Sequence, residues 1–169
     1  MENKADLRIK AKNIRKGLDI KHISEIACKK ISNLKEFQQA KNVMIFYPLE
    51  FEVNLLSLIS KDKNFYLPRM NGENLEVCPY KKGDTLNLSR FKTQEPITKA
   101  ISPNILDLII VPALIVDKNN YRLGYGKGFY DRLISKTKAK TIVPISKELL
   151  IDCLPTEQHD KKIDIVILI

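Results

Sequence analysis

The sequence predicts an α/β fold, a three-layer sandwich with a mainly parallel central sheet, built as one domain over residues 1–169. Two short apolar runs, residues 43–47 and 106–111, are each followed by a proline, as is typical of buried strands. Segments with helical periodicity lie before, between and after these runs. Strands that alternate with helices favour a sheet that is covered on both faces.

The N-terminal segment predicts two helices. Residues 4–18 form the first, because apolar side chains recur there at helical spacing, at Leu7, Ala11, Ile14 and Leu18. Basic residues lie one turn apart on another face of this helix, at Lys4, Arg8, Lys12 and Lys16. An ordinary solvated helix face carries such a stripe as well. The apolar pattern of residues 23–34 predicts the second helix.

The middle of the chain predicts shorter elements. We expect a short helix at residues 55–59 and strands at residues 64–67 and 75–78, with a turn at Asn71 and Gly72. Residues 81–103 have the least pattern and predict a loop with short elements.

The C-terminal part predicts a turn at residues 118–120, a glycine-rich loop, and a helix over residues 129–136. Strands are predicted at residues 142–145 and 163–168, with a short helix at residues 149–150 between them.

In such a sheet, ligands bind beyond the carboxyl ends of the strands. The segments that follow the predicted strands should therefore meet: residues 48–54, 68–69, those from 112 onward, and the glycine-rich loop. Glu50 and Glu52 lie in the first of these segments, and the sequence alone favours exposed loop carboxylates for both.

The composition, with 44% hydrophobic and 29% charged residues, is typical of a soluble globular protein. The longest apolar stretch, residues 105–116, is too short to span a bilayer, and the N-terminal residues 1–16 carry no apolar core of a signal peptide. We expect a cytoplasmic monomer that does not bind membranes.

The net charge of +9 raises the possibility of a nucleic-acid partner. The excess comes mainly from lysines that are scattered along the chain, and no RNA-binding aromatic motif or zinc finger is present. Anionic small-molecule substrates suit this charge, and we expect no nucleic-acid partner. A basic RNA-binding accessory protein stays as an alternative.

Cysteine and histidine usage disfavours a disulfide framework or a zinc site. Cys28, Cys78 and Cys153 lie far apart, no C-x-x-C motif occurs, and the histidines are His22 and His159. Cys28 falls in a predicted helix and Cys78 in a predicted strand, where small apolar side chains are expected.

The glycine-rich loop predicts a phosphate site. Three of the six glycines of the chain lie within residues 124–128, in the pattern G-x-G-x-G. Glycines allow several backbone N–H groups to converge on one anion, and a helix that begins after the loop adds its positive N-terminal end. Arg122 and Lys127 supply cationic donors beside these groups.

The loop differs from the two common phosphate motifs. A dinucleotide fingerprint requires G-x-G-x-x-G, and a Walker A loop requires a hydroxyl residue after Gly-Lys. Asp131 follows the loop, where a carboxylate either complements the helix dipole or, next to phosphates, requires a bridging Mg²⁺.

These motifs, taken together, resemble the 5-formyltetrahydrofolate cyclo-ligase family, also called 5,10-methenyltetrahydrofolate synthetases. The resemblance covers most of the chain and consists of Lys4-x-x-Leu7-Arg8, Tyr47-Pro48 with Glu52-Val53, Leu67-Pro68-Arg69, Glu95-Pro96, residues 107–112 with Asp117, residues 121–131, and Leu154-Pro155-x-x-x-His159-Asp160-x-x-x-Asp164. The chain departs from the family pattern around residues 90–96, where only Glu95-Pro96 is kept, and at residues 144–149.

The resemblance implies an ATP- and Mg²⁺-dependent ligase that cyclises 5-formyltetrahydrofolate to 5,10-methenyltetrahydrofolate and releases ADP and phosphate. It also implies a fold similar to that of ribose-5-phosphate isomerase and CoA transferases. A nucleotide-binding protein without ligase activity would carry the same loop, and it stays as a second alternative.

The resemblance also implies roles for individual residues. The residues similar to those that bind ATP are Lys4, Arg8, Arg122, Gly124, Gly126, Lys127, Gly128 and Tyr130. Those similar to the folate-binding residues are Glu52, Tyr125, Gly126, Lys127, Gly128 and Phe129. Arg122 and Lys127 are the catalytic candidates, and Asp131 and Asp164 are the Mg²⁺ candidates. His159 is expected to have a structural role in the turn that carries residues 160–164.

Overall fold

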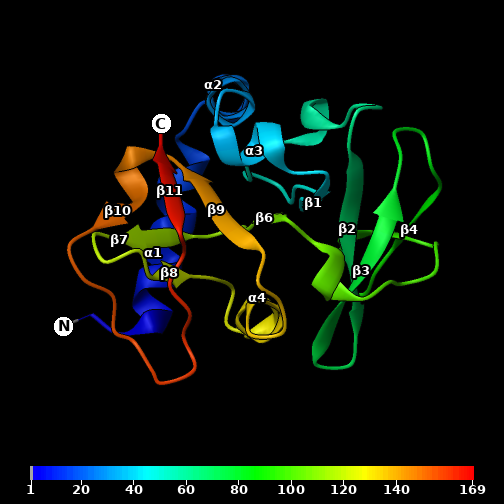
Figure 1. The fold of residues 1–169 in the computed structure, drawn as a ribbon. Coiled ribbons are helices and arrows are strands. Elements are labelled where there is room, and N and C mark those ends of the chain that lie inside the picture. The colour runs from blue at the N-terminus through cyan, green and yellow to red at the C-terminus, as the bar shows by residue number, and fades with distance from the viewer. Residues whose placement is uncertain (1) are drawn as a thin grey trace.

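A six-stranded sheet forms the middle layer of the molecule, in the order β11-β9-β6-β1-β2-β3 (Figure 1). Its strands are β1 (Asn42–Met44), β2 (Asn64–Asn71), β3 (Asn74–Tyr80), β6 (Leu108–Ile110), β9 (Lys140–Ile145) and β11 (Ile165–Leu168). All neighbouring strands run parallel except β2 and β3, which form an antiparallel hairpin. The predicted mainly parallel sheet is therefore confirmed. The computed structural model describes residues 2–169, and Met1 lies outside the described part.

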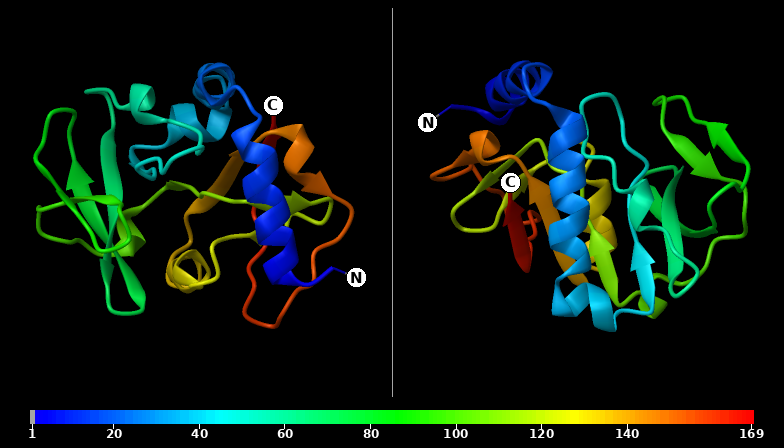
Figure 2. Two further views of the ribbon diagram at one scale, coloured as in Figure 1. Left: turned by 180° about the vertical axis from the view of Figure 1, so that it is seen from behind. Right: turned by 90° about the horizontal axis from the view of Figure 1, so that it is seen from above.

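Helices cover one face of this sheet (Figure 2). They are α2 (Ile20–Ser32), α3 (Lys35–Gln39) and the 3-10 turn η1 (Leu56–Leu58). Val43 and Ile45 point to this face and pack in one cluster with Ala27 and Ile31 of α2, whereas Met44 packs on the opposite face. This alternation is the period of two that an extended strand imposes on its side chains.

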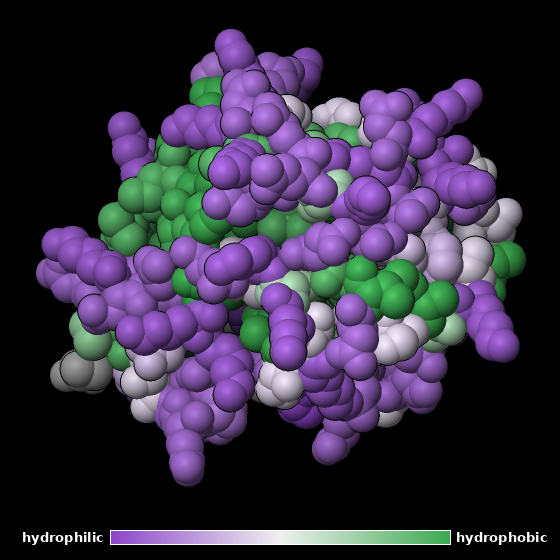
Figure 3. Space-filling view, viewed as in Figure 1, coloured by the Kyte–Doolittle hydropathy of each residue, from purple (hydrophilic) through white to green (hydrophobic). Residues whose placement is uncertain are grey.

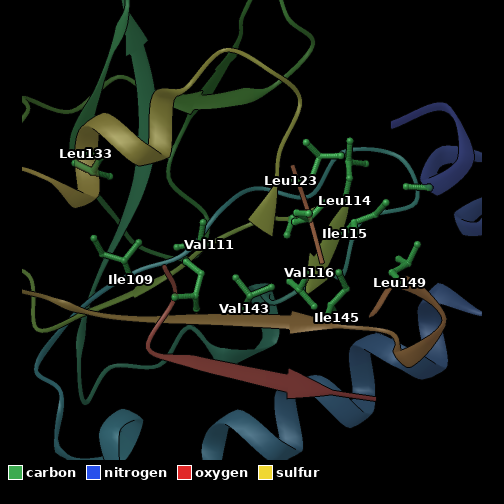
Figure 4. Close-up of a cluster of buried hydrophobic side chains, with 14 of the residues drawn as sticks. Ile109, Val111, Leu114, Ile115, Val116, Leu123, Leu133, Val143, Ile145 and Leu149 are labelled. Atoms are coloured by element: carbon green, nitrogen blue, oxygen red, sulfur yellow. The ribbon is translucent and has the colours of Figure 1, made fainter. Parts of the chain in front are cut away.

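The opposite face is covered by α1 (Lys4–Lys16), by α4 (Phe129–Ile134) and by a three-stranded sheet. The strands of that sheet are β7 (Ile115–Asp117), β8 (Arg122–Leu123) and β10 (Leu150–Ile151), in the order β10-β7-β8. In Figure 4, Ile109, Val143 and Ile145 of the large sheet lie in the same buried cluster as Leu114 and Leu123. Two packed faces give the three layers that the sequence predicts.

Residues 81–103, predicted to be a loop with short elements, contain two short strands. Strands β4 (Leu86–Leu88) and β5 (Gln94–Pro96) form an antiparallel hairpin. Two further 3-10 turns are η2 (Pro103–Ile105) and η3 (Lys147–Leu149). The predicted helix at residues 149–150 is thus a turn that ends at Leu149, and Leu150 begins β10.

Other differences from the predicted elements have local causes. The predicted helix over residues 23–34 is α2, which begins earlier, at Ile20, and ends at Ser32, while Leu34 precedes the separate helix α3. The predicted strand over residues 106–111 is β6, which ends before Pro112 as expected, because proline lacks the N–H group that a ladder requires; β7, later in the same apolar stretch, was not predicted. The two strands belong to different sheets.

A buried carboxylate fixes the turn that leads into the glycine-rich loop. Asp117 is 1% exposed, and its Oδ1 accepts hydrogen bonds from the N–H groups of Asn119 and Tyr121, both at 2.9 Å. Its Oδ2 accepts from the N–H of Leu154 at 2.9 Å. These bonds anchor the start of β8, and with it Arg122, to the small sheet.

Hydrophilic side chains cover most of the face seen in Figure 3, with an apolar area where Figure 1 places β11. No helix within residues 2–169 is long and apolar enough to cross a membrane. The three cysteines are free, with Cys28 in α2 and Cys78 in β3 as predicted.

Candidate active site

A cavity of about 710 Å³ opens where the carboxyl ends of the parallel strands meet the glycine-rich loop. The segment after β1 contributes Tyr47 and Glu52, the β2–β3 hairpin contributes Pro68 and Met70, and Pro112 follows β6. The predicted convergence of these segments is confirmed. Phe91, Thr93, Gln94 and Glu95 of the β4–β5 hairpin also line the cavity, although no role was predicted for that segment beyond the family match at Glu95-Pro96.

The structure brings all but one of the predicted site residues to this cavity. Its lining includes Lys4, Arg8, Glu52, Arg122, Gly124, Tyr125, Gly126, Lys127, Gly128, Phe129, Tyr130 and Asp131. Asp164 does not line it. The functional roles of these residues stay predictions.

The glycines of the loop leave room for arginine side chains. A Cβ on Gly124 would lie 2.9 Å from Arg122 Nη1, and a Cβ on Gly126 would lie 3.1 Å from Arg8 Cζ. Gly126 has φ +99°, a backbone conformation that side chains disfavour. Substitution there is therefore opposed both by the backbone and by a guanidinium group.

Arg122 is the most buried cation of the site, with a side chain that is 5% exposed. Its Nη2 lies 3.1 Å from Asp131 Oδ2, and its Cζ lies 5.7 Å from the ring centre of Tyr130. Burial lowers the pKa of Arg122, and the Asp131 carboxylate partly offsets this effect. The Nε donor has no hydrogen-bond partner among residues 2–169. Buried polar groups are rarely left without a partner, so this donor is an exception within the site.

Helix α1 brings two further cations, Lys4 and Arg8, to the cavity, as the family resemblance implied. Asn3 caps the helix by accepting from the N–H groups of Ala5 and Asp6, both at 2.9 Å. Lys4 Nζ lies 2.8 Å from Asp160 Oδ2 and 3.1 Å from Glu157 Oε1.

Burial alone would lower the pKa of Lys4, but its hydrogen bonds to Asp160 and Glu157 outweigh this effect and raise the pKa. Arg8, one turn after Lys4, donates through Nε to the carbonyl oxygen of Gly124 at 2.9 Å. Lys127 adds an exposed side chain from the loop. We call Lys4, Arg8, Arg122 and Lys127 the cationic group.

Glu52 is buried, and the expectation of an exposed carboxylate at this position was wrong. It is 5% exposed, whereas Glu50 is exposed as expected. Glu52 Oε2 accepts the N–H of Leu49 at 2.8 Å, and Oε1 accepts the hydroxyl of Tyr125 at 2.9 Å. Burial raises the pKa of Glu52, although these two hydrogen bonds and the charge of Arg15 act against the shift.

The two Mg²⁺ candidates lie in different surroundings. Asp131 Oδ1 accepts the N–H of Lys161 at 3.1 Å, and Oδ2 faces Arg122. Asp164 is exposed, and its Oδ2 accepts from Thr141 N and Oγ1 at 2.8 and 2.9 Å. Within residues 2–169, no group of three or more His, Cys, Asp or Glu side chains is arranged to hold a metal ion.

His159 lines the cavity rather than only supporting the turn behind it. Its Nε2 lies 3.4 Å from Glu157 Oε2 and 3.8 Å from Asp160 Oδ1, and its side chain is 66% exposed.

Sequence reasoning missed Arg15, which is buried beside Tyr125. A signal was present, because Leu7, Ala11 and Arg15 follow the four-residue spacing of the buried face of α1. A charged residue on an apolar stripe requires a buried partner. Glu157 and Asp160, which hold Lys4, had no comparable signal.

Comparisons with known proteins agree on one family. A sequence model described as the 5-formyltetrahydrofolate cyclo-ligase family matches residues 1–169. The chain is 31% identical over 143 residues to the 5-formyltetrahydrofolate cyclo-ligase of Haemophilus influenzae, covering 76% of this chain and 75% of that relative. It is 26% identical over 164 residues to the mouse 5-formyltetrahydrofolate cyclo-ligase, covering 85% of this chain and 81% of that relative.

Among solved structures, the 5,10-methenyltetrahydrofolate synthetase of Aquifex aeolicus superposes with a TM-score of 0.87 at 28% identity, covering 98% of this chain and 89% of that one.

Proposed function

Because the chain belongs to the 5-formyltetrahydrofolate cyclo-ligase family, we propose that it cyclises 5-formyltetrahydrofolate to 5,10-methenyltetrahydrofolate in the cavity described above. ATP is the co-substrate, and ADP and phosphate are the other products. One observation supports this assignment most directly. The cationic group and a buried carboxylate that holds two hydrogen bonds line the same cavity.

The chemistry explains why ATP is required. An N-formyl oxygen is a poor leaving group, so the oxygen must be activated before a second nitrogen can replace it. In the proposed reaction, the formyl oxygen attacks the γ-phosphorus, and the bond from that phosphorus to the bridging oxygen of ADP breaks. The second folate nitrogen then attacks the formyl carbon and loses its proton. The carbon–oxygen bond breaks, and phosphate leaves with the former formyl oxygen.

The cationic group suits the first of these steps. Phosphoryl transfer depends on alignment and on neutralising charge at the phosphate oxygens, rather than on covalent chemistry by the protein. Arg122 and Lys127 are proposed to contact the transferred phosphate, and Lys4 and Arg8 the rest of the triphosphate. The place of Arg122 in the cavity lining, next to the glycine-rich loop, supports this role, because a guanidinium group binds phosphate oxygens well.

The loop supports the cationic group and the folate together. Gly124, Gly126 and Gly128 keep the backbone close to the ligands, and Tyr130 backs Arg122 from the first turn of α4. On the folate side, Glu52 is proposed to accept hydrogen bonds from N–H groups of the pterin ring. The aromatic faces of Tyr125 and Phe129 pack against the same substrate.

Asp131 fits the Mg²⁺ that the family implies. A Mg²⁺ ion in such a site uses one or two carboxylates together with phosphate oxygens, and the Asp131 carboxylate lines the cavity beside the cationic group. The bound ion would neutralise charge on the triphosphate. Asp164 makes its hydrogen bonds with Thr141 outside the cavity lining, so its predicted role as a metal ligand has less structural support than that of Asp131.

Spectrophotometry of purified protein tests this proposal. With 5-formyltetrahydrofolate, ATP and Mg²⁺, we expect the methenyl chromophore and ADP to appear in equal amounts, and neither to form when one substrate is omitted. ATP binding without folate-dependent turnover would favour the nucleotide-binding alternative. Salt-sensitive RNA affinity without turnover would favour the RNA-binding alternative. The cytoplasmic location and the monomeric state stay part of the proposal and are checked by cell fractionation and sedimentation.

A further inference from the structure

Arg15 is a buried cation for which the proposed reaction has no direct use. It lies in the last turn of α1, is 7% exposed, and does not line the cavity. Burying a charge costs much free energy unless the group is paired and hydrogen-bonded. The contacts of Arg15 therefore indicate its role.

Those contacts form a chain that ends at the cavity. Arg15 Nη1 donates to the hydroxyl oxygen of Tyr125 at 3.3 Å, and Nη2 donates to the carbonyl oxygen of Ala113. The Tyr125 hydroxyl in turn lies 2.9 Å from Glu52 Oε1. Leu49 N–H holds the other carboxylate oxygen at 2.8 Å. Arg15 is therefore connected to Glu52 through one phenol.

The chemistry of the three groups fixes the direction of this chain. A guanidinium group has donors and no acceptor, so the Tyr125 oxygen must accept from Arg15. The single hydroxyl proton of Tyr125 is then left for Glu52, which can accept it only on an oxygen that carries no proton of its own.

From this geometry we propose that Arg15 is a positioning residue for the folate half of the site, which it serves by orienting the Tyr125 hydroxyl and keeping the Glu52 carboxylate ionised. The proposal rests on the proposed function in one respect, since 5-formyltetrahydrofolate is taken as the ligand of Glu52.

The charges around Glu52 agree with this role. Arg15 of α1 is the cation that acts on the buried carboxylate, and Tyr125 of the loop and Tyr130 of α4 are the other titratable groups coupled to it. Burial raises the pKa of Glu52, and both the Tyr125 hydrogen bond and the Arg15 charge oppose that rise. Without Arg15, the carboxyl should keep its proton to a higher pH and lose its ability to accept from the substrate.

The same helix holds the neighbouring loop residue through a different arginine. Arg8 donates to the carbonyl oxygen of Gly124, and Arg15 donates to Tyr125, so α1 anchors two consecutive loop residues two turns apart. Arg8 also belongs to the cationic group. The two arginines should therefore separate in their effects, Arg8 acting on ATP and Arg15 on folate.

Steady-state kinetics of three variants tests whether Arg15 affects folate binding without affecting ATP binding. Arg15→Gln keeps a donor and removes the charge, Arg15→Lys keeps the charge, and Lys16→Gln changes the adjacent exposed residue as a control. At pH 7, we expect Arg15→Gln to raise KM for 5-formyltetrahydrofolate about tenfold, with the increase shrinking at higher pH, and to leave KM for ATP unchanged. Arg15→Lys should restore part of the loss. An unchanged folate KM, or equal increases for both substrates, would overturn the proposal.

A measurement without substrate separates this proposal from the assigned reaction. Protein labelled with ¹³C at the glutamate carboxyls is titrated by NMR, and the Glu52 signal is identified by its loss in Glu52→Gln. We expect the titration midpoint of Glu52 to lie at a higher pH in Arg15→Gln than in wild type. An equal midpoint overturns the role of Arg15 even where turnover is normal, and absence of turnover in wild type overturns only the assigned reaction.

Tyr125→Phe is the variant to titrate if Arg15→Gln does not fold. It cuts the link from Arg15 to Glu52 and leaves α1 intact, so the midpoint should again rise. An unshifted Glu52 signal in Tyr125→Phe would contradict the chain of hydrogen bonds and with it the proposal.

Discussion

The cationic group and the Glu52 cluster lie at the same cavity but suit different ligands. The Glu52 cluster comprises Glu52 with Leu49, Tyr125 and Arg15. The cationic group offers several charges, of which Lys127 is exposed and Lys4 and Arg122 are held by carboxylates. The Glu52 cluster offers the cavity one buried carboxylate, with a donor already bound to each of its oxygens. A polyphosphate is bound by the number of cations around it, whereas a ring with N–H groups is bound by the direction of a single acceptor.

The two regions also differ in how the protein stabilises their charges. In the cationic group, carboxylates pair with Lys4 and Arg122 before any ligand binds. In the Glu52 cluster, burial opposes the charge that the ligand requires. Variants in the two regions should therefore differ in which substrate they affect and in how the effect depends on pH.

The largest loss of activity is expected from Arg122→Met. It removes the most buried member of the cationic group, and loss of one preorganised contact to developing charge typically costs about 2.7–4 kcal/mol, or about 10²–10³-fold in kcat. Single-turnover kinetics with saturating substrates measures the loss, and Lys140→Met, at an exposed lysine outside the cavity lining, is the charge-matched control. A folded Arg122→Met protein with wild-type kcat would remove Arg122 from the catalytic candidates.

Glu52→Gln should affect folate binding next most strongly. Replacing a charged acceptor by an amide leaves pterin donors poorly satisfied, at a cost of about 1.5–3 kcal/mol, roughly 10–100-fold in Kd. Titration calorimetry with 5-formyltetrahydrofolate should show this loss, while affinity for ATP stays within error of wild type. Equal losses for both ligands would mean that the two regions are not separate.

The stability of the same variant should depend on pH in a defined direction. The pKa of Glu52 is raised in the folded protein, so its favourable contribution is complete below the pKa of the unfolded chain and is lost as pH rises through the folded value. Gln does not titrate. Urea unfolding should therefore show Glu52→Gln gaining stability relative to wild type as pH rises through this window. A difference that stays constant with pH would contradict the raised pKa.

Gly126→Ala should weaken ATP binding by a smaller factor. Both Gly126 and Gly83 have positive φ, +99° and +95°, but only at Gly126 would a Cβ meet a neighbour, namely Arg8. Each substitution should cost about 1–3 kcal/mol of backbone strain. Only Gly126→Ala should displace Arg8 and raise Kd for ATP, by about tenfold. Equal ATP affinity in the two variants would show that the loop conformation is not what positions the cationic group.

Asp131→Asn and Asp164→Asn give the smallest expected effects and sharpen the metal assignment. Both keep side-chain shape and remove one charge. We expect Asp131→Asn to raise the Mg²⁺ midpoint of activity severalfold and lower turnover, because the ion loses a carboxylate beside the triphosphate. Asp164→Asn should alter thermal stability through its bonds to Thr141 and leave the Mg²⁺ midpoint unchanged. The reverse pattern would move the metal to Asp164.

The sequence was most informative where chemistry depends on spacing along the chain. The glycine pattern and the proline-ended strands predicted which segments line the cavity, because strand direction follows from local residues. The helical period placed Lys4 and Arg8 on one face of α1, but only the resemblance to one family implied that they reach the site. The resemblance to one family then added Glu52, which no local pattern distinguishes from Glu50.

What could not be predicted depends on contacts between distant segments. Glu52 is bound by the hydroxyl of Tyr125, which lies more than seventy positions later, and Lys4 is held by residues near the opposite end of the chain. The β4–β5 hairpin had no periodic signal, yet Phe91 reaches the cavity. Arg15 is the intermediate case, since its place on the buried face was visible but its partner was not.

The central claim is that both substrates react with each other in this one cavity, with the formyl oxygen attacking the γ-phosphate. The most direct test follows that oxygen. 5-Formyltetrahydrofolate labelled with ¹⁸O in the formyl group is converted in unlabelled water, and the released phosphate is analysed by mass spectrometry. We predict one ¹⁸O atom in each phosphate and unlabelled phosphate when only the water carries ¹⁸O. Label that appears in water, with phosphate oxygen drawn from the solvent, would contradict the proposed reaction.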